Sequence, residues 1–393
     1  MSIQRLGIGI CLVAVVAVMA MGNGRTKPVP KEVIKEVAAR KAFLTNAQKG
    51  DLKLKTVEQL SFAPNGVLLA AESRSAAVVA IETGDLGPMK RLEHNVHYLR
   101  QRVARAMGTR NAKDVVIRDM VANPLSGKIY LSVSRQGRNK PSTILTVGSN
   151  GKLAKLDLSK MSYARIKLPE GDASKVARIT DVEFAGDRVL AAGQCSEAFA
   201  NKIFSIPLPL KHGSTANIFS ARTYHVAHGR WETRAPIQSF IPLTEGKKKY
   251  VVGAFSCTPI AKFPLSNVKS GAKIVGTSVV ELGSGNQPLD MFTYEKGGKK
   301  WLVTNTYRFH YYRNLFGPSK WWGVRVSMDY MSAEKVNEKA TRRNTRKKSG
   351  PKGIEIMQEL FGAVQISKLS NEEMVVLRVV DEGERNLEIV KLP

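Results

Sequence analysis

The sequence predicts an all-β fold: a single β-propeller with six blades, with seven blades as the alternative count. The first observation is a repeated unit, in which a strand with Asp or Gln near its middle precedes a turn and an apolar strand. The second is that Gly, Asn, Asp and Pro separate these short runs, which is typical of β-hairpins. The third is that the last unit supplies only three strands while an alternating segment precedes the first unit, which indicates a ring closed by both chain ends.

The strands of the repeated unit recur along the chain. The first strands are TVEQLSFAPNG (56–66), VVIRDMVANPLSG (115–127), RITDVEFAGD (178–187), APIQSFIPLTEG (235–246), QPLDMFTYEKGG (287–298) and GAVQISKLSN (362–371). The second strands are VLLAAES, IYLSVSR, VLAAGQC, YVVGAFSC, WLVTNTYR and MVVLRVV. The propeller is therefore predicted over residues 51–393.

Closure of the ring is expected from the segment GDLKLK (50–55). Leu52 and Leu54 would pair as the outer strand of the blade that contains Ile389 and Leu392. A ring closed in this way leaves no open sheet edge.

Helices are expected outside the repeats. Residues 86–110 place apolar side chains at helical spacing, which predicts an amphipathic helix on the first blade: Met89, Leu92, Val96, Leu99, Val103 and Met107. A further helix over roughly 31–46 is expected within an N-terminal helical segment, 23–50. A second insertion, about 330–360, contains a polar stretch (333–353) with eight Lys or Arg against two Glu, and an exposed loop is expected there.

The N-terminus predicts a signal peptide over residues 1–22. Arg5 precedes an apolar run from Leu6 to Met21, and small residues follow near Ala20 and Gly22. The alternative is an uncleaved anchor, although the run is short for a membrane span. We therefore expect an exported chain, periplasmic or extracellular, without a transmembrane span after processing.

The repeated units, such as ITDVEFAGDRVLAAG (179–193), resemble those of secreted bacterial β-propellers of the YVTN and quinoprotein-amine-dehydrogenase-like group, including members without assigned activity. The resemblance covers about residues 51–393. It implies the propeller fold and carries over no catalytic residue.

Cys195 and Cys257 each follow a similar strand, which places them in equivalent loops of adjacent blades. In an exported chain they could form a disulfide, or stay separate thiols if their Cα atoms lie more than about 7 Å apart. His225 and His228 lie between them in sequence. The four side chains would suit copper or zinc, and the alternative is that the histidines pack between blades.

Asp119, Asp181 and Asp290 occupy the same position of three first strands. Because the innermost strands of a propeller line its axis, these carboxylates could converge there and hold Ca²⁺ or another divalent metal, including a hydrolytic centre. The alternative is that each hydrogen-bonds backbone within its own blade. The sequence makes no cofactor certain.

Charge is the strongest functional signal. The chain carries 61 Lys and Arg against 33 Asp and Glu, a net charge of +28, which favours an anionic partner. An acidic protein or anionic glycan is preferred to nucleic acid, because the chain is expected to be exported and shows no recognised nucleic-acid-binding motif. One basic cluster lies in the second insertion: Arg342, Arg343, Arg346, Lys347 and Lys348.

Aromatic rings interleaved with cations over residues 304–322 form a second candidate partner surface. Its predicted binding residues are Arg308, Tyr311, Tyr312, Arg313, Trp321 and Trp322. The alternative is that about half of these rings are buried in the fifth blade.

These observations favour an exported binding or scaffolding module for an anionic partner. The first alternative is a metal-dependent hydrolase with axial carboxylates. The second is a partner without its own cofactor in a quinoprotein-like redox complex. The sequence does not decide whether the protein is an enzyme, and it assigns no ligand and no oligomeric state.

Overall fold

The computed structural model divides the chain into two units, Met1–Ala42 and Phe43–Pro393. It describes residues 43–393 apart from 138–139, 170–175, 198–199, 257, 267–269, 284, 309–317, 338–350 and 381–382. The predicted signal peptide and most of the predicted N-terminal helix lie outside the described residues.

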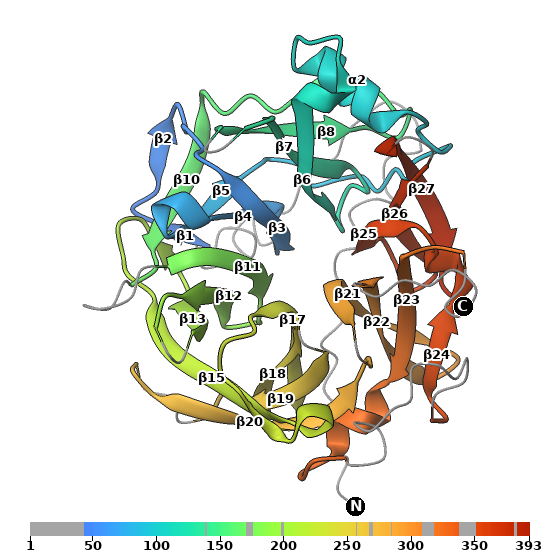
Figure 1. Cartoon of the computed structure of the whole chain (residues 1–393). Helices are drawn as coiled ribbons and strands as arrows, with labels where there is room; N and C mark the ends of the chain where they lie inside the picture. Colours follow the sequence, from blue (N-terminus) through green and yellow to red (C-terminus); the bar gives the residue numbers. More distant parts are fainter. Residues whose placement is uncertain are drawn as a thin grey trace, which may run out of the picture. The chain divides into compact units, whose positions relative to one another are not determined.

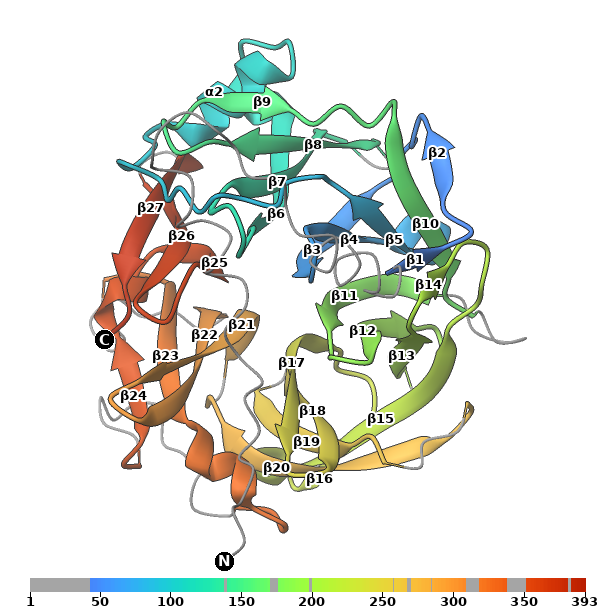
Figure 2. The same cartoon turned by 180° about the vertical axis from the view of Figure 1, so that it is seen from behind.

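The second unit is all-β, and its sheets radiate from a common centre in a propeller-like arrangement (Figure 1, Figure 2). The strands nearest the centre, here called the inner strands, are β3 (Val57–Ala63), β6 (Val115–Ala122), β11 (Val176–Phe184), β17 (Ile237–Glu245), β21 (Asn286–Lys296) and β25 (Ala363–Lys368). They contact one another in the cyclic order β3, β6, β25, β21, β17, β11 and back to β3.

From each inner strand, antiparallel strands follow outward. β3 leads to β4 (Val67–Glu72), β5 (Ala77–Glu82), β10 (Met161–Lys167) and β2 (Gln48–Gly50), and β6 leads to β7 (Ile129–Arg135), β8 (Ser142–Val147) and β9 (Leu153–Lys155). β21 leads to β22 (Lys299–Arg308), β23 (Trp321–Ser327) and β24 (Ile354–Met357), and β25 leads to β26 (Glu373–Val379) and β27 (Arg385–Lys391). The predicted first and second strands of all the repeated units are confirmed.

The strands that follow the two remaining inner strands, β11 and β17, belong to a single sheet. β11 leads to β12 (Arg188–Cys195), β13 (Asn201–Pro207) and β15 (Asn217–His225), whereas β17 leads to β18 (Lys248–Phe255), β19 (Pro259–Pro264) and β20 (Lys273–Glu281). β15 and β20 pair in parallel, so these strands and β16 (Arg230–Glu232) form one nine-stranded sheet. Outside it, β1 (Leu44–Thr45) pairs in parallel with β14 (Leu210–Lys211).

The order of the sheets around the centre differs from their order in the sequence. The strands β6–β9 lie in the chain between β5 and β10 of the first sheet. In space this inserted sheet lies between the first sheet and the C-terminal one, because β6 contacts both β3 and β25 (Figure 1).

The ring closes between the inserted sheet and the C-terminal sheet. Val96, in the loop before α2 (Leu99–Ala106), donates a backbone hydrogen bond of 2.8 Å to Leu387 and accepts one of 2.9 Å from it. The predicted closure by residues 50–55 is therefore wrong. Leu52 instead donates its backbone N–H to the carbonyl of Leu158 at 2.9 Å, and Leu52 and Leu54 fill the core between the first and inserted sheets.

The helical predictions are only partly correct. Of residues 86–110, only α2 is an α-helix, because Gly87 at φ 105° and Pro88 keep the preceding segment extended. The helix packs on β6, β9 and β27 rather than on the first sheet, with Leu99 and Val103 buried there. At the end of the predicted N-terminal helix, residues 44–45 and 48–50 are strands, and within the second insertion residues 354–357 form β24. The described residues include no helix with the length and apolar character needed to span a membrane.

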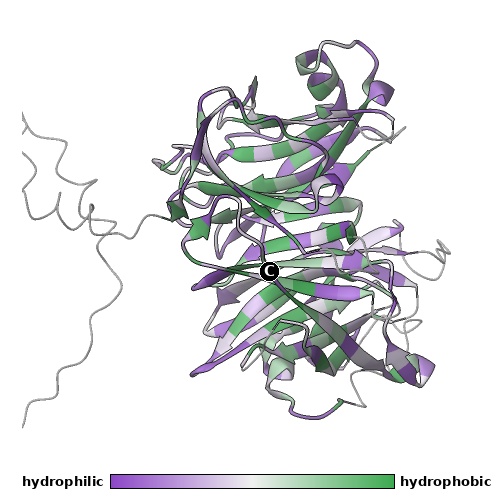
Figure 3. Cartoon of the chain, turned by 90° about the vertical axis from the view of Figure 1, so that its left-hand side faces the viewer, coloured by the Kyte–Doolittle hydropathy of each residue, from purple (hydrophilic) through white to green (hydrophobic). Residues whose placement is uncertain are grey.

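Hydrophobic packing between neighbouring sheets forms the core. All six residues of β4 are buried, and β12 and β22 each contain five consecutive buried residues, Val189–Gly193 and Leu302–Thr306, because sheets cover both of their faces. Figure 3 shows hydrophobic colour along many of the strands, with hydrophilic residues interspersed. Burial on both faces explains why the second strands are continuous apolar runs in the sequence.

The closure can be tested at Leu387, whose side chain is 0% exposed and packs in a cluster with Val96 and Leu99. Leu387→Ala should lower the free energy of unfolding by about 2–5 kcal/mol, because it leaves a cavity where the ring closes. Urea unfolding measures the change. The control Lys391→Ala alters an exposed position of the same strand and should change stability by less than about 0.5 kcal/mol. Equal effects of the two substitutions would show that the seam does not hold the ring.

Candidate axial site

Every inner strand carries an irregularity at the same place. The pairing with the second strand shifts register between Val57/Gln59, Ile117/Asp119, Ile179/Asp181, Ile237/Ser239, Pro288/Met291 and Ala363/Gln365. Such a β-bulge frees backbone groups from the ladder and redirects the side chains beside it. The three predicted aspartates lie at these bulges.

Each aspartate accepts a hydrogen bond from the backbone of a neighbouring inner strand. Asp119 Oδ2 accepts from Leu60 N at 2.6 Å. Asp181 Oδ2 accepts from Phe240 N at 2.7 Å, and Asp290 Oδ2 accepts from Ile366 N at 2.9 Å. The alternative, in which each aspartate hydrogen-bonds backbone within its own blade, is therefore wrong for the three Oδ2 atoms. Asp181 Oδ1, by contrast, accepts from Val182 N of its own strand at 2.8 Å.

The donor and acceptor strands alternate around the centre. β6, β11 and β21 supply the carboxylates, and β3, β17 and β25 supply the amides. Other contacts between inner strands use uncharged groups, such as the bond of 3.0 Å from Ala122 N to Ser367 Oγ. The carboxylates are thus distributed around the axis rather than gathered in one sheet.

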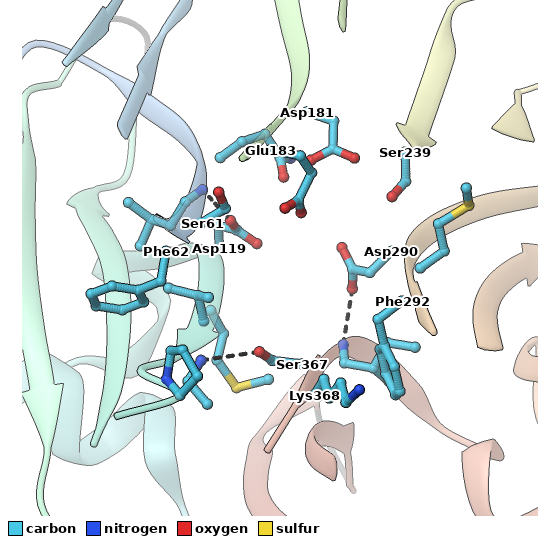
Figure 4. Close-up of a pocket in the computed structure, with 18 of the residues that line it drawn as sticks. Ser61, Phe62, Asp119, Asp181, Glu183, Ser239, Asp290, Phe292, Ser367 and Lys368 are labelled. Atoms are coloured by element: carbon cyan, nitrogen blue, oxygen red, sulfur yellow. Dashed lines mark hydrogen bonds between the residues drawn. The ribbon is translucent and has the colours of Figure 1, made fainter. Parts of the chain in front are cut away.

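These carboxylates line a pocket of about 270 Å³ at the centre of the ring (Figure 4). Glu183 joins them, two residues beyond Asp181 on the same strand, and its carboxylate reaches toward the same space. The remaining wall is mixed and includes Phe62, Met120, Met291, Phe292, Ser61 and Lys368. The pocket therefore combines a dense negative charge with aromatic and aliphatic surfaces.

Burial and mutual repulsion raise the pKa values of this cluster. Burial raises the pKa of Asp181 to about 7 and that of Asp290 to about 7, and Asp181 adds repulsion on Asp290. The pKa of Asp119 lies well above its usual range because of burial and then of repulsion from Asp290. Burial, with repulsion from Asp181 and Asp119, likewise raises the pKa of Glu183. The hydrogen bonds from backbone amides offset only part of these effects, so the group shares protons near neutral pH.

Ser61 adds an unsatisfied polar group to the pocket wall. Its side chain is 3% exposed, and its hydroxyl has no hydrogen-bond partner among the described residues. A buried hydroxyl without a partner costs roughly 1–3 kcal/mol, so a group bound in the pocket that bonded it would be favoured.

Sequence reasoning found three of the four carboxylates and missed Glu183 and Ser61. The signal for Glu183 was its spacing, because residues two apart on a strand face the same side. No sequence signal marks Ser61. The side chain of Asn305 bridges two sheets by accepting from Asp290 N at 3.0 Å and donating to Ala363 O at 3.1 Å.

The predicted metal site would use the three aspartates of the pocket. In the part of the chain that the structure describes, no group of three or more His, Cys, Asp or Glu side chains is arranged to hold a metal ion. A cation shared by Asp119, Asp181 and Asp290 stays a prediction, which metal analysis of the purified protein would test.

The cysteine and histidine predictions fall elsewhere in the fold. Cys195 is buried in a hydrophobic cluster with Val176 and Ile179, and Cys257 lies outside the described residues, so the disulfide stays a prediction. The rings of His225 and His228 lie 4.1 Å apart. His225 is buried between two carboxylates, with Nε2 3.3 Å from Glu281 and Nδ1 3.7 Å from Glu232. This arrangement matches the alternative in which the histidine packs between strands.

The aromatic partner surface is corrected at two positions. Trp322 is 3% exposed and Arg308 is 4% exposed; the guanidinium stacks 3.4 Å from the indole centroid, and both bond Asn286 Oδ1. They belong to the core and are not available to a partner. Trp321 is half-buried beside Lys320. Tyr311, Tyr312, Arg313 and the basic cluster Arg342, Arg343, Arg346, Lys347 and Lys348 lie outside the described residues.

Comparison with known proteins adds no family. No family model matches the chain, and no curated protein matches it. Among solved structures, a PQQ-bound aldose sugar dehydrogenase from Streptomyces coelicolor is 11% identical with a TM-score of 0.33, covering 88% of this chain and 97% of its own. A GH43 endo-arabinanase from Bacillus licheniformis is 9% identical with a TM-score of 0.35, and the match covers 70% of this chain and 92% of that one. The protein GH43B of a Bacteroides ovatus xyloglucan locus is 9% identical with a TM-score of 0.35, and the match covers 71% of this chain and 52% of that one. Likenesses this low carry no argument about function.

The raised pKa of Asp290 predicts a pH-dependent stability. Because the folded state holds this proton more tightly than the unfolded chain, the contribution of Asp290 to stability is complete below about pH 4 and is lost as pH rises toward 7. The substitution Asp290→Asn would keep a side-chain oxygen as acceptor for Ile366 and remove the charge. Relative to the wild type, this variant should therefore gain about 1 kcal/mol or more between about pH 4 and pH 8, measured by urea unfolding.

Asp187→Asn is the control for this titration. Hydrogen bonds from Arg188 and Lys249 hold the pKa of Asp187 below its usual range, so its contribution to stability appears as pH rises. Because this contribution is complete above about pH 4, the difference in stability between Asp187→Asn and the wild type should stay constant from about pH 4 to pH 8. Identical trends for the two variants would exclude the proposed origin of the effect.

Proposed function

We propose that this chain is a ligand-binding β-propeller whose axial pocket binds the cationic group of a small molecule. The observation that carries the proposal is the convergence of Asp119, Asp181, Glu183 and Asp290 on one pocket. The binding class is the one that the sequence favoured. The acidic axis provides a binding site in addition to the expected anionic partner of the basic exterior.

A bound cation would relieve the main electrostatic cost of the site. One oxygen of each aspartate is held by a backbone amide, and the carboxyl groups resist ionisation because they are buried close to one another. An opposite charge nearby lowers the pKa values of such groups and stabilises their ionised forms. Cation binding should therefore be coupled to the release of protons.

The size and lining of the pocket favour an organic cation over a bare ion. Its volume of about 270 Å³ is roughly nine times the share of one water molecule in the liquid, about 30 Å³. Phe62 and Phe292 provide apolar surface that a metal ion would not use, and a cation can also be attracted to an aromatic face. An amine with a small apolar body fits this lining.

The finer architectural assignments accompany this proposal. We count six blades by dividing the nine-stranded sheet at its parallel β15–β20 pair, and we place the protein in the YVTN and quinoprotein-like group on the repeated units alone. We also propose that residues 1–22 direct export to the periplasm or the extracellular space. Detection of a chain starting after residue 22 in the extracytoplasmic fraction would support this assignment.

An anionic macromolecular partner is the second candidate function, supported by the net charge of +28. An acidic protein or anionic glycan would bind the basic exterior, for which this charge provides long-range attraction. The metal-dependent hydrolase and the redox partner remain alternatives. Stoichiometric metal in the purified protein would favour the hydrolase, and co-purification of a cofactor-bearing chain would favour the redox partner.

The axial proposal predicts pH-dependent binding of a simple amine. Isothermal titration with n-butylamine should show tighter binding at about pH 8 than at about pH 6, because Asp181 and Asp290, whose pKa is about 7, lose protons over this interval. Asp181→Asn and Glu183→Gln should each weaken binding at least about 10-fold at the higher pH, equivalent to about 1.4 kcal/mol. The control Asp157→Asn removes an exposed carboxylate outside the pocket and should have no effect. Tighter binding of Ca²⁺ than of any amine would instead favour the metal alternative.

The anionic-partner proposal predicts strong salt dependence. The protein should elute from immobilised heparin as salt rises, because salt screens charge interactions beyond about 8 Å at physiological ionic strength. Elution should need less salt when five cations are replaced by Gln: Arg342, Arg343, Arg346, Lys347 and Lys348. The melting temperature should stay unchanged, since the segment has no apolar pattern to bury. Retention that is independent of both salt and the five substitutions would remove charge as its basis.

A further inference from the structure

We propose that the ligand of the axial pocket is zwitterionic, with an ammonium group that binds the carboxylates and an anionic group that pairs with Lys368. This inference rests on the proposed function and adds the chemical class of the ligand. Amino acids and ω-amino acids are the simplest molecules with this pattern.

Lys368 is the one cationic side chain that lines the pocket in the described part of the chain. It lies at the end of β25, two residues beyond Ile366, whose amide binds Asp290. No hydrogen bond or ion pair to its ammonium group occurs among the described residues. Burial lowers its pKa, while the nearby charge of Glu295 opposes that effect. A half-buried cation beside an acidic pocket, without an ion pair, is a suitable partner for an anionic group of a ligand.

The pocket is arranged in two layers along the inner strands. Asp181, Asp290 and the amide donors form the first layer, and Phe62, Glu183, Phe292 and Lys368 each lie two residues further along their strands. Two residues of strand span about 6.6 Å. In the view of Figure 4, Lys368 lies across the space from Asp181 and Glu183, and Asp290 and Phe292 lie between them on one side. A short molecule with opposite charges at its ends would contact both layers.

Ser61 provides an observation that is independent of charge. Its hydroxyl is buried, lines the pocket and has no partner among the described residues. A polar group of a ligand lying between the layers could accept or donate the missing hydrogen bond. The described residues therefore give the pocket three features that a ligand could complement: excess negative charge, a cation without an ion pair and a hydroxyl without a hydrogen-bond partner.

Neither a purely anionic nor a purely cationic ligand would match all the charged groups that line the pocket. A purely anionic ligand would meet the repulsion of four carboxyl groups, and a purely cationic ligand would leave Lys368 without a counterion. Pairing within the protein does not remove the difficulty, because no ion pair joins Lys368 to Glu183 in the described structure.

The experiment compares matched ligands by isothermal titration at about pH 8, above the pKa of about 7 of Asp181 and Asp290. The series runs from glycine to 6-aminohexanoate, and each amino acid is paired with the alkylamine and the carboxylate of the same chain length. At least one amino acid should bind 10-fold or more tightly than its amine. Lys368→Met should abolish that advantage while the affinity for the amine is kept or improved, and Lys368→Arg should preserve it. Lys152→Met, at an exposed site, is the control.

The outcomes separate this inference from the proposed function. If amines bind but no amino acid binds more tightly, or if Lys368→Met leaves the preference intact, the zwitterionic ligand is wrong and the cation pocket stands. If no member of the series binds the folded protein, both proposals fail. Ser61→Ala should weaken the preferred amino acid about threefold or more without lowering the thermal stability, and equal affinity would remove Ser61 from the site.

Discussion

The hydrogen bond from a backbone amide of one inner strand to an aspartate of the next is the interaction on which the arrangement of the sheets depends. Within a sheet, antiparallel ladders satisfy the backbone, whereas neighbouring inner strands are not paired in a ladder and are connected here by side chains. Each inner strand is the edge of its strand series and presents backbone amides that the ladder does not use, and Asp119, Asp181 and Asp290 accept three of them. The bonds tie the inner strands in pairs around the axis.

This solution has an electrostatic cost that creates the candidate site. Three of the acceptors are carboxylates held near one another, and burial raises the pKa values of Asp181 and Asp290 to about 7. Each aspartate uses mainly one oxygen to bond its neighbour, and Glu183 adds a charge that no inner-strand bond requires. Structural carboxylates and an additional acid thus share one pocket, which is the setting in which ligand binding can compensate repulsion.

The order of the sheets around the axis differs from that of a ring assembled in sequence order. Because the sheet β6–β9 is inserted between β5 and β10, the C-terminal sheet meets the inserted sheet and not the first one. Two backbone hydrogen bonds between Val96 and Leu387, and the packing of α2 over them, close the ring. The closure relies on a hydrophobic cluster more than on a shared strand, since the β-pairing across the seam in the described residues is one isolated bridge.

The sequence by itself determined the strands and the positions of the aspartates, because alternation, turn residues and the repeated Asp are local signals. It also placed Asp119, Asp181 and Asp290 at equivalent points of the repeat. The tertiary structure decided which sheets are neighbours, which strands carry the closing contact and which backbone amide each aspartate accepts. It alone revealed that Glu183, Ser61 and Lys368 share the pocket, and that Trp322 and Arg308 are core. The physical reason is that these relations join residues far apart in sequence, whose packing depends on the insertion of one sheet into another and leaves no periodic trace in the chain.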